Sequence, residues 1–279
     1  MVLALGPANV LGELDAKPEA SAPATPGRTA PSTPMFSLAA PADPDGLVAP
    51  GANFSAWTLL DRATGKATGS SDAGSERNTV ESMIKPWLAA DYLRLAAESG
   101  ETPSEDTLDE LTLMIVDSND PLAESYYQIG GADAVIERLV DLCGLTDTYI
   151  EPGLWGMTQM TPLDAVRYGA CLADGRAAGP QWTPWILDTM KKVRGGVDDQ
   201  ASGEVQGGRW GIIDGLPPEL ARDTSIKNGW TEYFDGWHVN CLAVHPDWVL
   251  AVMMRMPDQL SVAAEGCAAI ASKLVVDHA

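Results

Sequence analysis

The sequence predicts an α+β fold in which an antiparallel sheet, flanked by N- and C-terminal helices, carries an all-helical lobe. Hydrophobic residues recur at helical spacing through the middle of the chain, whereas they follow strand patterns before and after it. The resulting order is a strand pair, a helical block, successive strands and a closing helix. With 279 residues, 45% of them hydrophobic, the chain can bury one sizeable core or two lobes that share an interface.

Residues 1–52 are expected to precede the folded domain. Residues 2–14 are apolar, but no Lys or Arg precedes them, and the run is short for a membrane span. Residues 15–50 are rich in Ala, Pro, Ser and Thr without periodicity, which is typical of a tether. An exported protein with a trimmed signal or membrane anchor fits this pattern, and a cytosolic protein with a disordered arm is the alternative.

The folded domain is expected over residues 53–279, and it begins with a strand pair. Residues 54–62 (FSAWTLLDR) form the first predicted strand, and residues 63–66 form a turn into a short second strand. From residue 81 to about residue 97 the pattern becomes helical and mostly apolar, which is typical of a helix buried in a domain. Further helices are expected over residues 104–116, 132–142, 162–172 and 183–193.

The end of the chain changes from the helical period to that of strands. Successive strands are predicted over residues 209–213, 224–231, 237–244 and 248–256, and a closing helix over residues 262–276.

Composition argues against several classes of function. A formal charge of −21 disfavours nucleic acid as a partner, because phosphate binding needs clustered Lys and Arg. The four cysteines lack any Cys-x-x-Cys spacing, which disfavours a zinc or redox site, and no cofactor is expected. In an exported protein they could form disulfides, with three pairings open among Cys143, Cys171, Cys241 and Cys267. The three histidines suggest neither a metal site nor a triad.

The only Ser-x-x-Lys of the chain runs from Ser82 to Lys85, where the apolar helix begins. The two residues share one helical turn there, so the amine can lie beside the hydroxyl. A lysine in a dry site has a lowered pKa and can take the serine proton, which makes the hydroxyl a nucleophile at neutral pH. Pro86 is tolerated in a first helical turn, which supports this helix start. A capping serine with a snorkelling lysine is the alternative.

The triplet Ser118-Asn119-Asp120 follows one predicted helix and precedes another. A polar triplet at such a junction more often caps the next helix than it catalyses a reaction. By itself the triplet therefore predicts little.

A second short motif, Lys227-Asn228-Gly229-Trp230, lies in a predicted strand. A lysine followed by glycine on a strand that faces a cleft could hold a carboxylate, while the backbone approaches the substrate closely. A solvent-facing lysine at a bulge is the alternative.

The order of the three motifs is similar to that of class A β-lactamases and penicillin-binding proteins. The chain resembles this superfamily from about residue 54 to its end, and it looks most like the smaller exported serine hydrolases related to class A. The resemblance implies a sheet with flanking helices, an all-helical lobe, and an active site between them. Supporting stretches are residues 54–66, 155–170, 209–212 and 227–244.

The resemblance implies a role for each matched residue. Ser82 would be the acylated nucleophile, and Lys85 would accept its proton. Ser118 would pass a proton to the leaving nitrogen, and Lys227 would hold the substrate carboxylate. The backbone N–H groups of Ser82 and Trp230 would form the oxyanion hole.

The second and third motifs depart from the pattern of the superfamily. Ser-Asn-Asp replaces Ser-Asp-Asn, so either Asn119 or Asp120 would orient the substrate. Asn228 stands before Gly229 where Thr or Ser is usual, which removes a hydroxyl from the substrate site. Glu151 partly matches the glutamate that activates water for deacylation, with a surface glutamate as the alternative.

We therefore predict a serine hydrolase that forms an acyl-enzyme through Ser82 on a β-lactam or a D-Ala-D-Ala-like amide. A catalytically degenerate binding module for cell-wall fragments is the alternative, and a tailoring acyltransferase is a third hypothesis. The retained serine and lysines favour an enzyme. The expected partner is a small-molecule or peptidoglycan-derived substrate, the expected location is extracellular or at the cell envelope, and the expected state is a monomer.

Overall fold

The computed structural model of the protein describes residues 36–202 and 207–277. The apolar N-terminal run and the tether up to residue 35 lie outside the described residues. Among the helices of the described part, none is long and apolar enough to cross a membrane.

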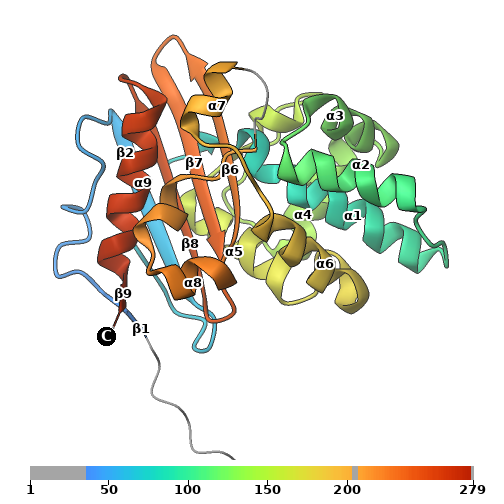
Figure 1. The fold of residues 1–279 in the computed structure, drawn as a ribbon, viewed down its shortest axis with the longest axis horizontal. Helices are drawn as coiled ribbons and strands as arrows, with labels where there is room; N and C mark the ends of the chain where they lie inside the picture. Colours follow the sequence, from blue (N-terminus) through green and yellow to red (C-terminus); the bar gives the residue numbers. More distant parts are fainter. Residues whose placement is uncertain (1–35, 203–206, 278–279) are drawn as a thin grey trace, which may run out of the picture. The chain divides into compact units, whose positions relative to one another are not determined.

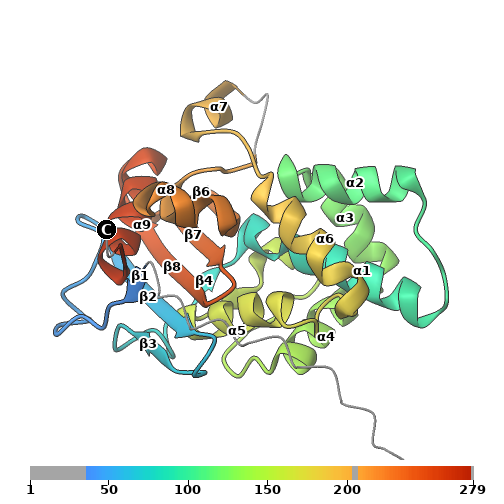
Figure 2. The same cartoon turned by 60° about the horizontal axis from the view of Figure 1, so that its bottom comes forward.

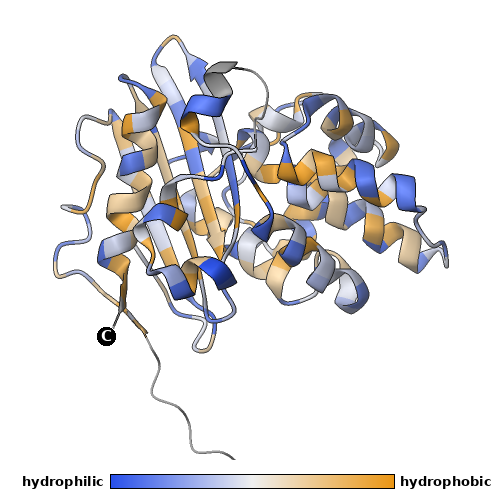
Figure 3. Ribbon diagram, viewed as in Figure 1, coloured by the Kyte–Doolittle hydropathy of each residue, from blue (hydrophilic) through white to orange (hydrophobic). Residues whose placement is uncertain are grey.

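A five-stranded antiparallel sheet, in the order β3-β2-β8-β7-β6, forms one of the two parts of the domain (Figure 1). The central strand β8 is buried along nearly its whole length, so its apolar run WVLAVMMRM contacts the core on both faces. Figure 3 shows hydrophobic stretches in the sheet beside hydrophilic ones, and the sequence of β6 is largely hydrophilic. The strands are β2 (Phe54–Asp61), β3 (Ala67–Gly69), β6 (Ser225–Tyr233), β7 (Gly236–Val244) and β8 (Trp248–Met256).

Two helices cover the sheet. Helix α5 (Pro162–Ala173) packs against β2, β7 and β8, and helix α9 (Leu260–Leu274) packs against β7 and β8 (Figure 2). A disulfide between Cys241 of β7 and Cys267 fixes α9 to the sheet.

Helices α1 to α4 and α6 form the all-helical lobe, which lies next to β6 (Figure 1). Helix α1 is its centre, because it is buried around most of its circumference, as its apolar sequence predicts. The elements are the 3₁₀ turn η1 (Glu81–Ile84), α1 (Lys85–Glu98), α2 (Glu105–Val116), α3 (Asp120–Ile129), α4 (Asp133–Cys143) and α6 (Gly179–Lys191). Ser104 caps α2 by accepting a hydrogen bond from the N–H of Thr107.

Short elements complete the described chain. They are β1 (Phe36–Leu38), β4 (Asn78–Thr79), η2 (Trp155–Met157), β5 (Gln159–Met160), α7 (Val197–Ser202), η3 (Gly211–Gly215), α8 (Pro218–Asp223) and β9 (Val275–Asp277).

The predicted fold class is confirmed, with two corrections. Residues 36–52, expected as the end of the tether, belong to the domain and contribute strand β1. This strand pairs with β9, which stands where the last residues of the closing helix were predicted. Residues 36–52 are held by backbone pairing with β9 and the end of α9, and by hydrogen bonds with two side chains of β2, which no periodicity in the sequence reveals. Residues 209–213, expected as a strand, lead into η3, because Gly211 has φ +84° and its N–H donates to the Asp214 carboxylate.

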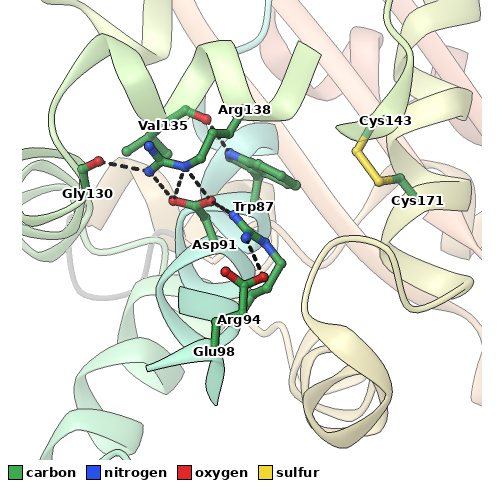
Figure 4. Close-up of polar contacts among 9 residues, drawn as sticks. All are labelled: Trp87, Asp91, Arg94, Glu98, Gly130, Val135, Arg138, Cys143 and Cys171. Carbon is green, nitrogen blue, oxygen red and sulfur yellow. Dashed lines mark hydrogen bonds and ion pairs between the residues drawn. A yellow bond between two sulfur atoms is a disulfide. The ribbon is translucent and has the colours of Figure 1, made fainter. Parts of the chain in front are cut away.

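The cysteines form two disulfides. Cys143 at the end of α4 is bonded to Cys171 of α5 (Figure 4). This bridge therefore joins the helical lobe to a helix that packs against the sheet. Together with the bridge from β7 to α9, it selects one of the three pairings that the sequence left open.

An ion cluster in the helical lobe fixes the orientation of α1. Asp91 of α1 is only 1% exposed, and its carboxylate accepts hydrogen bonds from Arg138 of α4 and from Arg94 (Figure 4). The Trp87 indole also donates to the carbonyl of Val135, at 2.9 Å. These contacts attach α1 to α4, and thereby hold the turn that precedes α1 in place.

Arg138→Met is expected to lower the free energy of unfolding by about 3 kcal/mol, because it leaves the buried carboxylate of Asp91 with one cation instead of two. Methionine keeps the length and apolar stem of arginine, so the loss reports on the polar contacts of the guanidinium, with Asp91 and with the carbonyl of Gly130. Chemical denaturation measures the change. The matched control is Arg222→Met, whose exposed pair with Glu219 spans 3.8 Å and should contribute less than about 1 kcal/mol. Equal losses in the two variants would contradict the structural role of the cluster.

Candidate active site

A cleft of about 550 Å³ lies between the outer strand β6 and the helical lobe. It is open to solvent at the level of Ser82, the predicted nucleophile. Its walls come from η1, the start of α3, the loop around η2 and strand β6. The lining residues are Glu81, Ser82, Ser118, Asp120, Pro121, Glu124, Gly153, Leu154, Trp155, Gly156, Met157, Trp230 and Thr231.

Ser82 lies on η1 directly after a residue with an unusual backbone. Glu81 has φ +52°, a conformation that costs a non-glycine residue roughly 1–3 kcal/mol and persists only where contacts hold it. Its carboxylate accepts hydrogen bonds from the hydroxyls of Thr231, at 2.8 Å, and Tyr233, at 2.9 Å, both on β6. Strand β6 therefore holds the backbone turn that presents Ser82 to the cleft.

Strand β6 approaches the nucleophile closely at Gly229. A Cβ atom at this position would lie 2.2 Å from the carbonyl oxygen of Val80 and 2.9 Å from the backbone nitrogen of Ser82. Only glycine fits there without moving one of the two segments, which is the close backbone approach that the motif predicts. Ser82 and Trp230 thus meet at the same end of the cleft, and the oxyanion hole formed by their N–H groups stays a prediction.

The three other predicted catalytic residues form one buried cluster. The hydroxyl oxygen of Ser118 lies 3.1 Å from the Nζ atom of Lys85 and 2.9 Å from that of Lys227. Both lysines are fully buried, and Ser118 is 2% exposed. The Lys85 amine also donates to the Ser118 carbonyl oxygen. The sequence motifs therefore meet in space, although they lie on η1–α1, the α2–α3 turn and β6.

Burial changes the proton affinity of both lysines. It lowers the pKa of Lys85, while the carboxylate of Asp120, 2.5 Å from its Nζ atom, opposes this change. Burial also lowers the pKa of Lys227 well below its usual value, and the nearby charge of Lys85 adds to that effect. An amine with a lowered pKa can be neutral at physiological pH, which is the state that accepts a proton.

Asn119 and Asp120 have different places in the structure. The side chain of Asn119 caps α3 by accepting a hydrogen bond from the N–H of Leu122, at 2.9 Å. Asp120 lines the cleft, and its side chain is 63% exposed although it also contacts Lys85. Of the two alternatives that the sequence left open, only Asp120 lines the cleft, and its role toward a substrate stays a prediction.

Asn228 faces away from the cleft. Its amide donates to the carbonyl oxygens of Gly208, at 2.9 Å, and Trp210, at 2.8 Å. Side chains alternate between the two faces of a strand, so Lys227 and its neighbour Asn228 point to opposite sides of β6. Asn228 is 1% exposed and does not line the cleft.

The loop around η2 brings Trp155 to the cleft instead of Glu151. The Trp155 ring lies 5.5 Å from the Nζ atom of Lys85, and its indole N–H donates to Glu124 at 3.0 Å. Glu151 is not among the residues that line the cleft. Its role in deacylation stays untested, and the structure offers no contact between its side chain and the nucleophile.

Sequence reasoning missed two glutamates of the cleft, Glu81 and Glu124. Both could have been noticed from their positions. Glu81 directly precedes the nucleophile, and Glu124 lies four residues after Asp120, which places both side chains on one face of α3.

Asp120→Asn is expected to lower the pKa of Lys85 further, because it removes the carboxylate that favours the ammonium form. Deprotonation of Lys85 should then occur at lower pH. NMR titration of protein labelled at the lysine Cε atoms measures this, with Lys85→Met to assign the signal. Glu219→Gln, which removes an exposed acid on α8, is the matched control and should leave the titration unchanged. An unchanged titration in Asp120→Asn would contradict the ion pair.

No protein-family model matches the chain. Over 189 residues the chain is 30% identical to a curated protein described as "Putative lipoprotein LppW" from Mycobacterium tuberculosis, and to the protein of the same description from Mycobacterium bovis. The matched region covers 67% of this chain and 56% of that protein. The chain therefore spans little more than half the length of these curated relatives.

Solved structures of similar fold are β-lactamases and a penicillin-binding protein. An ancestral class A β-lactamase has a TM-score of 0.59 at 17% identity, covering 80% of this chain and 93% of that chain. A β-lactamase from Xanthomonas campestris has a TM-score of 0.60 at 18% identity, covering 80% and 91%. A variant of PBP-A, solved as an acyl-enzyme complex with penicillin G, has a TM-score of 0.59 at 15% identity, covering 80% and 89%.

Proposed function

We propose that this chain, whose fold is that of the serine β-lactamase and penicillin-binding-protein superfamily, is a serine hydrolase that forms an acyl-enzyme through Ser82. Its substrate would be a β-lactam or a D-Ala-D-Ala-like amide. The observation that carries the proposal is the shared hydroxyl of Ser118, which two buried lysine amines contact beside the cleft that Ser82 lines.

The cluster supplies the proton transfers that acylation requires. The Ser82 hydroxyl would give its proton to the neutral amine of Lys85 as the oxygen attacks the carbonyl carbon. The bond from that carbon to the leaving nitrogen would then break, and the nitrogen would take the proton of Ser118. A lysine ammonium would return a proton to Ser118, so the charges balance at the end of the step. Water later adds to the ester carbon, which releases the acid and restores Ser82.

The Asp120 carboxylate influences the protonation state of Lys85, on which this chemistry depends. It favours the ammonium form of Lys85, which cannot accept a proton. We therefore expect acylation to become faster as the pH rises through the pKa of Lys85. The same ion pair is the observation that favours the second candidate function, a binding module for cell-wall fragments in which Ser82 is not acylated.

We further propose that the protein works outside the cytoplasm, at the cell envelope. The two disulfides support this location, because structural disulfides persist mainly in oxidising compartments. The lipoprotein description of the curated relatives agrees with it. A substrate derived from peptidoglycan would be available there.

Incubation with penicillin G is expected to add the mass of one penicillin to the wild-type protein and none to Ser82→Ala, because the hydroxyl is the acylated group. Intact-mass spectrometry over time measures the adduct. Ser75→Ala, which removes an exposed serine upstream of η1, is the matched control and should be acylated like the wild type. Thermal denaturation shows whether Ser82→Ala is folded.

The lifetime of the adduct then separates two activities. A persistent adduct would indicate a penicillin-binding protein, and an adduct that decays to the hydrolysed drug would indicate a β-lactamase. Absence of any adduct on folded wild-type protein at saturating drug would contradict acylation by β-lactams and favour the binding module.

A further inference from the structure

We propose that the cleft selects acyl donors that carry a positively charged ammonium group. This inference rests on the proposed acyl transfer through Ser82 and names the class of substrate for the same site. It follows from the charges that line the cleft and from the way in which they are held.

The lining of the cleft carries three carboxylates and no cationic side chain. Glu81 belongs to η1, and Asp120 and Glu124 belong to the first turns of α3. The two lysines near the nucleophile do not form part of the lining, since both are fully buried. A negatively charged group in the open part of the cleft therefore meets no free cation from the described residues.

The two glutamates differ from Asp120 in that only neutral groups hold them. Asp120 forms an ion pair with Lys85, which cancels its charge locally. The four carboxylate oxygens of the glutamates accept hydrogen bonds from two hydroxyls, one indole and one amide. These donors are Thr231 and Tyr233 for Glu81, and Trp155 and Gln128 for Glu124.

Neutral donors fix the direction of a carboxylate without removing its charge. Each oxygen can accept more than one hydrogen bond, so both glutamates keep capacity for an ammonium group. None of the ion pairs found among the described residues involves Glu81 or Glu124. The cleft thus holds two oriented carboxylates that form no ion pair with any described residue, although the charge of Glu81 also acts on Lys85.

Aromatic surface adds a second reason to expect a cation. Trp155 lines the cleft, and the face of an indole attracts cations, whereas the ring of Trp230 packs against that of Trp210. The Trp155 ring already lies 5.5 Å from the Lys85 amine, which shows that this ring has an ammonium group as a neighbour. Carboxylates beside an indole face are a combination that suits an ammonium ligand and disfavours an anionic one.

Three penicillins that share one nucleus test the inference. Penicillin G, ampicillin and carbenicillin differ in the side chain of the acyl donor, which carries no charge, an ammonium group and a carboxylate, respectively. The rate constant for acylation of Ser82 is measured for each by intact-mass spectrometry. We expect ampicillin to react fastest and carbenicillin slowest, with a spread of at least roughly tenfold that shrinks as salt is added.

Glu124→Gln isolates the charge, because glutamine keeps the size of the side chain and one acceptor oxygen. The variant is expected to reduce the ratio between the fastest and the slowest acylation rate constant severalfold. The matched control is Glu265→Gln, which removes an exposed carboxylate from α9, on the layer that packs against β7 and β8. This control should retain the spread, and it separates a local effect from the general charge of −21.

The possible results distinguish the two proposals. Equal rates for the three penicillins, or fastest reaction with carbenicillin, would overturn the charge selection and leave the acyl-enzyme proposal intact. A spread that Glu265→Gln narrows as much as Glu124→Gln would also overturn it. No acylation by any of the three drugs would overturn the proposed function, and the inference with it.

Discussion

Two buried lysine amines that share one hydroxyl join the three parts of the cleft. Lys85 belongs to the start of α1, Lys227 belongs to β6, and Ser118 lies in the turn between α2 and α3. Amines without access to water are unstable in a protein interior unless polar groups surround them. The hydroxyl of Ser118 contacts both amines, and its backbone is in the left-handed region, with φ +57°. The placement of the helical lobe against the sheet therefore depends on a small polar cluster in an otherwise apolar core.

The two departures from the motifs of the superfamily, Asp120 and Asn228, differ in their effect on the charge of the site. With Asp120 beside Lys85, the ion pair adds no net charge, and burial together with the charge of Lys85 favours the neutral form of Lys227. An asparagine at position 120 would carry no negative charge and would let burial lower the pKa of Lys85 further. At the third motif, Asn228 turns its amide away from the cleft. The first departure adds a carboxylate to the cleft and the second adds no polar group to it, so the charge of the cleft lining is that of its carboxylates.

Helices and strands with a regular apolar period are predicted correctly from the sequence. The prediction is wrong where single contacts, rather than a period, determine the conformation. Residues 36–52 show no pattern, because pairing with β9 and irregularly spaced apolar contacts hold them rather than a face of regular period. At Gly211 a positive φ and a side-chain hydrogen bond turn a strand-like sequence into η3. In the site, the order of the motifs was enough to predict that Ser118 and the two lysines lie together beside the cleft that Ser82 lines. It could not decide between Asn119 and Asp120, since that depends on which side chain caps α3.

Glu81 shows how positioning and charge are combined at the nucleophile. Its carboxylate accepts the hydroxyls of Thr231 and Tyr233, and these bonds hold a backbone turn that is unfavourable for a glutamate. Burial, together with the charge of Glu81 and its hydrogen bond, raises the pKa of Tyr233 to about 12. Replacing Glu81 would therefore change the geometry of Ser82 together with the charge of the cleft. Glu124 lies on a regular helix, where its carboxylate caps nothing and holds no strained turn, so its charge can act on a ligand without acting on the nucleophile.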